Sequence, residues 1–239
     1  MKRSNVYDSE NEKKLHYKNV KNYFKKSAAD KCGFYELKSE EKLERELKKR
    51  SMWKVYTSTL NEILKSDSNI SNGIDVACGM GNFTRELSKH KRFQNIIGID
   101  FLKETFDIAI KTKNKFLNTS FFQGDLLNLP FKDSSFELTV CLNTLHHIHK
   151  NDFLKAIYEL SRVTKKYLMI EIRNKNYIFY FWKTKIVLPR LYKDLPIYSN
   201  SIFKLNKLME KNNFKLKILR GNSVISFSSW RLVAVYEKF

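Results

Sequence analysis

Compact apolar runs rich in β-branched residues recur along the chain from residue 73 onward. Two of them, Gly73–Ala77 and Asn95–Asp100, combine glycine with β-branched isoleucine or valine, a pattern typical of buried parallel strands. The same criteria predict seven strands, at Gly73–Ala77, Asn95–Asp100, Thr119–Gly124, Phe136–Asn143, Lys166–Arg173, Phe214–Arg220 and Arg231–Lys238.

The segments between these runs have helical spacing of apolar residues, as in Phe153, Ile157 and Leu160. Alternating strands and helices predict an α/β fold, a doubly wound seven-stranded sheet with helices on both faces. Only Gly221–Trp230 joins the last two strands, too little for a helical crossover, so we expect an antiparallel hairpin there and an otherwise mostly parallel sheet. The predicted helices are Phe83–His90, Lys103–Lys115, Asp152–Val163 and Ser201–Asn213.

Residues 10–65 also have a helical pattern, with no proline and one glycine, Gly33. The charge-dense run Glu40–Arg50 includes the i,i+4 pair Glu44 and Lys48, which is typical of a solvated helix face. We therefore divide the chain into an N-terminal helical cap, residues 1–70, and a main domain, residues 71–239, with an insertion at 174–200.

The composition narrows the class of protein. The three cysteines, Cys32, Cys78 and Cys141, are far apart, so neither a disulfide framework nor a zinc site is indicated, and a reducing, cytoplasmic setting fits best. The N-terminus lacks an apolar signal region, and no run approaches the roughly 20 apolar residues of a membrane span. We expect a soluble or membrane-peripheral protein that is not exported.

The net charge of +20 raises nucleic acid as a partner. Residues 151–239 hold much of the excess, with 18 basic and 6 acidic side chains. Lysine greatly outnumbers arginine in the chain, however, which weakens the case for nucleic acid.

Glycine is scarce, yet five of the seven glycines lie between residues 73 and 124. The segment Asp75–Asn82 ends a strand and opens a helix, where glycines allow a ligand to approach the backbone and free amides can donate. Asp100 ends the next strand, 19 residues after Gly81, where an acidic residue can accept from ribose hydroxyls. The pattern predicts a nucleoside-like ligand in this crevice.

Two departures from phosphate-binding motifs narrow the chemical class of this ligand. Thr84 or Arg85 stands where a third glycine would be, and the loop lacks the ending of a P-loop, so a pyrophosphate is disfavoured. Asp75 would repel a phosphate but attract a cation such as an amino group or a sulfonium.

Four motifs in order carry a family resemblance. They are Asp-x-x-Cys-Gly-x-Gly at 75–81, Gly-Ile-Asp at 98–100, the segment Gly124–Glu137, and Asn-Thr-Leu-His-His-Ile at 143–148. Over residues 73–173 the chain resembles class I S-adenosylmethionine-dependent methyltransferases, in particular the broad group with the ubiquinone and menaquinone biosynthesis enzymes. The resemblance implies a Rossmann-like fold, S-adenosyl-L-methionine as cofactor and methyl transfer. The family's Pro-Gly-Gly turn before the fifth strand is absent, which weakens the subgroup assignment only.

The resemblance also implies residue roles. Asp75 and Gly79–Gly81 would hold the amino-acid end of the cofactor, and Asp100 would accept from the ribose. The adenine would lie against Phe101 or Leu102, and Asn143 would line the methionine side. As alternatives, Asp100 could be a helix N-cap and Asp125 a turn residue. The full set of expected cofactor-binding residues is Asp75, Ala77, Gly79, Gly81, Asp100, Phe101, Asp125, Leu126 and Asn143, with Asp125 and the Leu126 amide on the adenine.

Methyl transfer from a sulfonium is an in-line displacement to which alignment of the reactants contributes most. His146 and His147 follow the fourth strand and are the candidates for a catalytic base, with packing of the Leu-His-His turn as the alternative. We expect His149 to be exposed. No carboxylates at ligand spacing accompany these histidines, so no metal is expected.

The insertion 174–200 combines a run of aromatic residues at 177–182 with basic ones. In the resembling family this position contributes to the acceptor pocket or lid; a membrane interface, unpaired bases or simple packing are alternatives. We expect a small, hydrophobic or lipid-linked acceptor, with Tyr17, Tyr23 and Phe24 closing over the cofactor. An RNA (tRNA) methyltransferase and a non-catalytic binding subunit are the two alternatives.

Overall fold

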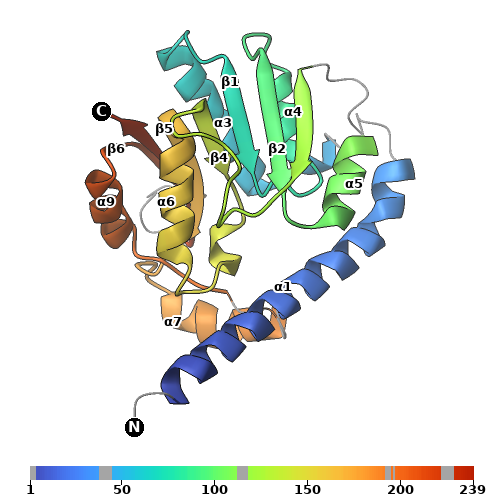
Figure 1. Ribbon diagram of the computed structural model, residues 1–239, viewed down its shortest axis with the longest axis vertical. Coiled ribbons are helices and arrows are strands. Elements are labelled where there is room, and N and C mark those ends of the chain that lie inside the picture. The colour runs from blue at the N-terminus through green and yellow to red at the C-terminus, as the bar shows by residue number, and fades with distance from the viewer. Residues whose placement is uncertain (1–3, 38–44, 112–117, 192–194, 196, 222–228) are drawn as a thin grey trace.

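A computed structural model describes residues 4–37, 45–111, 118–191, 195, 197–221 and 229–239. Its centre is one seven-stranded sheet of order β3-β2-β1-β4-β5-β7-β6 (Figure 1). The strands are β1 (Asn72–Val76), β2 (Asn95–Asp100), β3 (Thr119–Gln123), β4 (Phe136–Cys141), β5 (Thr164–Arg173), β6 (Phe214–Gly221) and β7 (Arg231–Lys238). All seven predicted strands are present, with ends that differ by at most two residues.

The first five strands are parallel, and β7 runs antiparallel to both of its neighbours, β5 and β6. The predicted antiparallel pairing of the last two strands is therefore confirmed, and so is the mostly parallel α/β sheet. The insertion of β7 between β5 and β6 was not predicted. It places Arg231, at the start of β7, opposite Arg173, at the end of β5.

Helices cover both faces of the sheet, as predicted. One face packs against α3 (Ser51–Ser66) and α4 (Asn82–Ser88), through buried residues such as Leu60 and Leu87. The other packs against α6 (Phe153–Val163) and α9 (Ile202–Lys211), through Ile157, Leu160 and Leu205. The helix α5 (Lys103–Lys111) follows β2 and packs on the β2–β3 edge. These two apolar layers hold the strand ends, and hence the loops that follow them, in fixed positions.

The long helix α1 (Ser4–Leu37) lies across one end of this body and packs against α5, with Lys25 Nζ 2.7 Å from a Glu104 carboxylate oxygen (Figure 1). Residues 10–65, predicted as helical, thus form elements in two different places, because α3 joins the face of the sheet. Residues 38–44, which include much of the predicted charge-dense helix, lie outside the described residues, as do 112–115 of the predicted helix after β2.

The insertion forms α7 (Tyr180–Trp182), the π-helical turn η2 (Lys183–Val187) and α8 (Leu188–Leu191). A 3₁₀ turn, η1 (Leu145–His147), follows β4. No helix within the described residues has the length and apolar content that a bilayer crossing requires. Cys78 and Cys141 are free thiols, and the side chain of Cys32 lies outside the described part of the chain.

Candidate functional site

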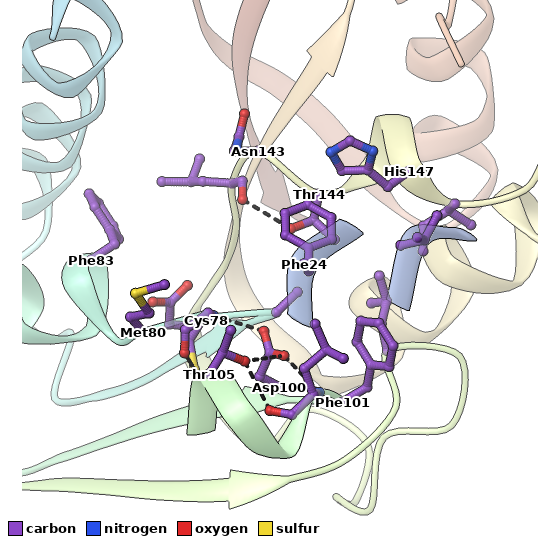
Figure 2. Close-up of a pocket in the computed structure, with 18 of the residues that line it drawn as sticks. Phe24, Cys78, Met80, Phe83, Asp100, Phe101, Thr105, Asn143, Thr144 and His147 are labelled. Atoms are coloured by element: carbon purple, nitrogen blue, oxygen red, sulfur yellow. Dashed lines mark hydrogen bonds between the residues drawn. The ribbon is translucent and has the colours of Figure 1, made fainter. Parts of the chain in front are cut away.

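A cavity of about 750 Å³ opens where β1, β2 and β4 end. The loops after these strands form one part of the lining, the strand-end wall, and side chains from α1 and α3 form another, the helical wall. Figure 2 shows Asp100 and Thr105 at one end of this space and Asn143, Thr144 and His147 at the other. Parallel strands bring their carboxyl ends to a single edge of the sheet, so residues far apart in sequence meet here.

The loop after β1 has a left-handed backbone at several positions. Gly79 and Gly81 have φ of 55° and 75°, and Ala77, which is not a glycine, has φ of 58°. A Cβ on Gly81 would lie 2.8 Å from the Phe121 ring, so both backbone and space require glycine there. Gly81 itself does not line the cavity but precedes α4 and shapes the turn.

Asp75 is buried at the base of the cavity and accepts a 2.7 Å hydrogen bond from Thr84 Oγ1. Burial raises the pKa of this carboxyl to about 7. The ionised acid thus carries a desolvation penalty that a nearby positive charge on a ligand would relieve.

Asp100 organises the loop between β2 and α5. Its carboxylate accepts from the Gly79 amide at 2.8 Å, the Leu102 amide at 2.9 Å and Thr105 Oγ1 at 3.0 Å (Figure 2). Burial raises its pKa even against these donors. Asp100 therefore makes the contacts expected of a helix N-cap and also lines the cavity, as both predictions require.

Asp125 and Leu126 line the cavity beyond β3. One Asp125 oxygen accepts from the Leu127 amide at 2.9 Å, which is the turn contact that the sequence offered as an alternative. Leu126 is buried and belongs to the core beneath the cavity.

Asn143, with φ of 56°, sits above a buried ionic network. Its Oδ1 accepts from Arg173 Nη2 at 3.0 Å and Arg231 Nη2 at 3.2 Å. Both arginines also bind Glu171, which is fully buried and receives the hydroxyl of Tyr56 from the cavity wall. Although burial alone would raise it, Arg173 and Arg231 hold the pKa of Glu171 below its ordinary value. The network is therefore charged, and it fixes two cavity residues.

The histidines after β4 have different surroundings. His147 lines the cavity, whereas His146 does not and contacts Arg173, whose Nη2 lies 3.1 Å from the His146 Nε2. Burial, together with Arg173, lowers the pKa of His147 to about 3, and burial with His147 and Arg173 lowers that of His146 well below its ordinary value. The expectation that His149 is exposed is wrong, because α1 covers it: the His16 and His149 ring centroids lie 5.5 Å apart.

The helix α1 is held over the cavity by polar contacts with the segment after β4. Lys13 Nζ and the Tyr17 hydroxyl donate to Asp152 at 2.6 and 2.7 Å, and His16 Nε2 donates to the His147 carbonyl at 2.7 Å. The Phe24 ring packs edge-on to His147 at 5.1 Å. Two of the three residues expected to close the cavity, Tyr17 and Phe24, do line it, whereas Tyr23 is exposed.

The cavity gathers most of the residues that the sequence nominated for the cofactor. All of that set except Gly81 line it. The described residues of the insertion 174–200 are not among the lining residues, and α1 and α3 take that place. Sequence reasoning missed much of the helical wall, in particular Lys18 and Lys21 of α1, Trp53 and Tyr56 of α3, and Arg50 just before α3. A signal for the network existed in the acid Glu171 within the otherwise apolar strand Tyr167–Ile172.

Comparison with known proteins agrees with this geometry. A family model described as a methyltransferase domain matches residues 74–167. A demethylmenaquinone methyltransferase of Staphylococcus saprophyticus is 31% identical over 96 residues, 40% of each chain. An uncharacterised protein of Methanocaldococcus jannaschii is 31% identical over 155 residues, 63% of this chain and 57% of its own. The chain thus matches well under two thirds of the length of these curated relatives.

Among solved structures, magnesium protoporphyrin IX methyltransferase from Synechocystis with bound SAH is similar at a TM-score of 0.67 and 16% identity, over 92% of this chain and 98% of that one. At this identity the likeness concerns the fold. It extends over nearly the whole chain, beyond the segment that the family model matches.

Proposed function

Residues 74–167 form a class I methyltransferase domain, and on that premise we propose that the protein transfers a methyl group from S-adenosylmethionine to a small apolar acceptor. The observation that carries the proposal is a single cavity that brings together Asp75, Asp100, Asp125 and Asn143 beneath a helical wall. Bound there, S-adenosylmethionine supplies a methyl group on a positively charged sulfur.

The residues of the cavity fit that cofactor. Asp75 is buried without a basic partner among its described hydrogen bonds, so a cationic ammonium or sulfonium would favour its ionised form. The left-handed turn at Gly79 lets a ligand approach the backbone closely. Asp100 keeps acceptor capacity beside its three donors, because each carboxylate oxygen has two lone pairs. We assign it the ribose hydroxyls, and Asp125 with Leu126 the adenine.

For the acceptor, the helical wall is the informative surface. Trp53, Tyr56 and Phe83 pack edge-to-face at 5.8 to 6.5 Å between ring centroids and give the cavity an aromatic side. Relatives named for demethylmenaquinone and magnesium protoporphyrin IX support a small-molecule acceptor. Lys18 and Lys21 at the rim favour an acceptor that carries an anionic group beside its apolar body.

We assign rate enhancement mainly to alignment in a closed cavity. Correct placement of two reactants can lower a barrier by roughly 7–11 kcal/mol without a catalytic base. His147 is the histidine that lines the cavity, but a pKa of about 3 makes it a weak base. His146 contacts Arg173 and has a packing role in this account.

A screen with labelled methyl tests the acceptor. Quinones, acidic lipids and tRNA are offered with the cofactor, and we expect transfer to an apolar anionic small molecule. Lys18→Gln and Lys21→Gln each raise the KM for that acceptor up to about fivefold, as expected of an exposed ion pair of about 0.2–1 kcal/mol. Lys26→Gln, an exposed lysine of α1 outside the cavity, is the matched control.

The net charge of +20 favours one alternative, an RNA methyltransferase. Transfer of label to tRNA but to none of the small molecules would establish it. Tight cofactor binding with no transfer to any acceptor would favour the other alternative, a non-catalytic binding subunit.

A further inference from the structure

The segment 178–186 exposes several large apolar side chains next to one another. Ile178 is 79% exposed, Phe181 72%, Phe179 60% and Trp182 53%. Scattered exposed apolar residues are common on protein surfaces, but contiguous ones mark an interaction site. The cavity does not account for these side chains, since none of them lines it.

These exposed side chains belong to an ordered segment that is anchored to the rest of the protein. Residues 180–191 are helical without a break through α7, η2 and α8, and Leu188 of α8 is buried. The rings of Tyr177 and Tyr180 pack on Trp230, each at 6.1 Å, and a bridge between Asn174 and Asn200 closes the base of the segment. In the view of Figure 1, α7 lies below α6 at one end of the molecule. The apolar side chains therefore project from a fixed platform.

The charge of the segment identifies its partner. Residues 174–191 contain Lys175, Lys183, Lys185 and Arg190 and not a single acidic residue. Aromatic and aliphatic side chains beside lysines suit the boundary between headgroups and acyl chains, where lysine attracts anionic lipids. We propose that the surface of residues 175–186 docks onto an anionic phospholipid bilayer.

Two other occupants fit less well. Single-stranded RNA is bound by stacking on aromatic rings, whereas the most exposed side chain here is the aliphatic Ile178, and the segment has one arginine. A second copy of the chain in a two-fold dimer would bring the same lysines face to face. A bilayer accepts both the aliphatic residues and the uniform positive charge.

The insertion that carries the docking surface also contacts the segment that borders the cavity. The Tyr198 amide, at the end of the insertion, donates to the His146 carbonyl at 2.9 Å, and its ring packs on His16 of α1 at 5.3 Å. The end of the insertion thus contacts the helix that covers the cavity. This inference goes beyond the proposed methyl transfer, because binding to lipid requires neither cofactor nor acceptor.

Co-sedimentation with vesicles tests the proposal, using phosphatidylcholine alone or mixed with phosphatidylserine. We expect the full-length protein to bind the mixed vesicles. The pair Phe181→Ser and Trp182→Ser weakens that binding about tenfold or more. The pair Lys175→Gln and Lys185→Gln weakens it about 25-fold, about fivefold for each lysine, and leaves binding to phosphatidylcholine unchanged.

The helix α9 supplies matched controls. It exposes Phe203, which is 62% exposed, beside Lys204 and Lys207. Phe203→Ser and the pair Lys204→Gln and Lys207→Gln should change vesicle binding by no more than about twofold. The lysine substitutions change only the ends of exposed side chains and should leave the fold intact. They therefore decide the test even if the pair Phe181→Ser and Trp182→Ser lowers the stability of the protein.

Three results would overturn the proposal. The wild-type protein could fail to bind the mixed vesicles, or the α9 control variants could lose as much binding as the variants of residues 175–186. The third is vesicle binding that neither the aromatic pair nor the lysine pair weakens. A single-stranded RNA oligonucleotide that binds through Phe181 and Trp182 in place of vesicles would show the other partner. Concentration-dependent dimers abolished by the same pair would show a self-association face. Cofactor titration of the variants is a separate readout, so failure of docking is distinguishable from failure of methyl transfer.

Discussion

The two walls of the cavity are built in different ways. The strand-end wall consists of loops that neighbouring parallel strands bring together, as in the bond from the Gly79 amide to Asp100, which spans 21 residues. The helical wall consists of aromatic and basic side chains from α1 and α3, held by partners more than a hundred residues away, such as Tyr17 on Asp152. The strand-end wall is therefore suited to one particular ligand. The helical wall could be adapted to a different ligand by substitution of a few side chains.

Specificity for the two ligands is divided between the two walls. In our account the cofactor depends on the strand-end wall and the acceptor on the helical wall, so a change in one wall should spare the ligand of the other. Substitutions on the walls, and in the network that fixes Asn143 and Tyr56, test how the cavity is held and what it binds.

The largest effect is expected from Glu171, which supports the acceptor side from below. Glu171→Gln leaves Arg173 buried without its carboxylate and should lower the free energy of unfolding by about 3–5 kcal/mol. Urea unfolding measures this change. The matched control Glu62→Gln breaks an exposed pair with Arg220 and should change stability by no more than about 1 kcal/mol. Equal losses in both variants would contradict a special role for the network.

Asp75→Asn should have opposite effects on stability and on cofactor binding. The folded-state pKa of Asp75, about 7, lies above its unfolded value of 3.8, so its contribution to stability is full below pH 3.8 and lost as pH rises through 7. The amide that replaces the carboxyl cannot ionise, so the ligand-free variant should be more stable at pH 8 by about 2–4 kcal/mol. Its affinity for S-adenosylmethionine should fall about tenfold or more, since the buried negative charge is lost.

A pH series on wild type sharpens this prediction. Below pH 7 a cationic cofactor must displace the proton of Asp75, so affinity should decline as pH falls. Thermal unfolding and calorimetric titration at several pH values measure the two effects. Cofactor affinity that stays constant from about one pH unit below that pKa to one unit above it would contradict the assignment of Asp75.

The smallest effect is expected from His147, where the two walls meet. His147→Asn should lower kcat by less than about tenfold, because a base with pKa of about 3 contributes little to proton removal. A loss of about a hundredfold or more, together with a lost limb of the pH–rate profile, would instead make His147 the catalytic base.

Sequence alone was sufficient for the strands of the sheet and for most of the strand-end wall, but not for the place of β7 between β5 and β6. Short apolar runs indicate buried strands, and Asp75, Asp100 and Asp125 each lie in, end or follow such a run. The turn contact of Asp125 is also local, because the hydrogen bond from the Leu127 amide spans only two residues.

The helical wall could not be predicted in the same way. That α1 covers His149 depends on contacts between His16 and residues 131 or more positions later, and no local pattern reports such a contact. The partners of Glu171 depend on β7 entering the sheet between β5 and β6, which places Arg231 beside β5. Long-range topology decides both, and periodicity reports only the type of each element.

Binding of the cofactor is tested most directly by calorimetric titration of wild type and Asp100→Ala with S-adenosylmethionine and its demethylated product. We predict binding to wild type and a loss of about a hundredfold or more in the variant, because charged hydrogen bonds contribute about 1.5–3 kcal/mol each. Asp107→Ala, an exposed carboxylate on the adjacent α5, should bind as wild type does. A folded wild type that binds neither ligand, or an Asp100→Ala variant that binds as well as wild type, would contradict the account.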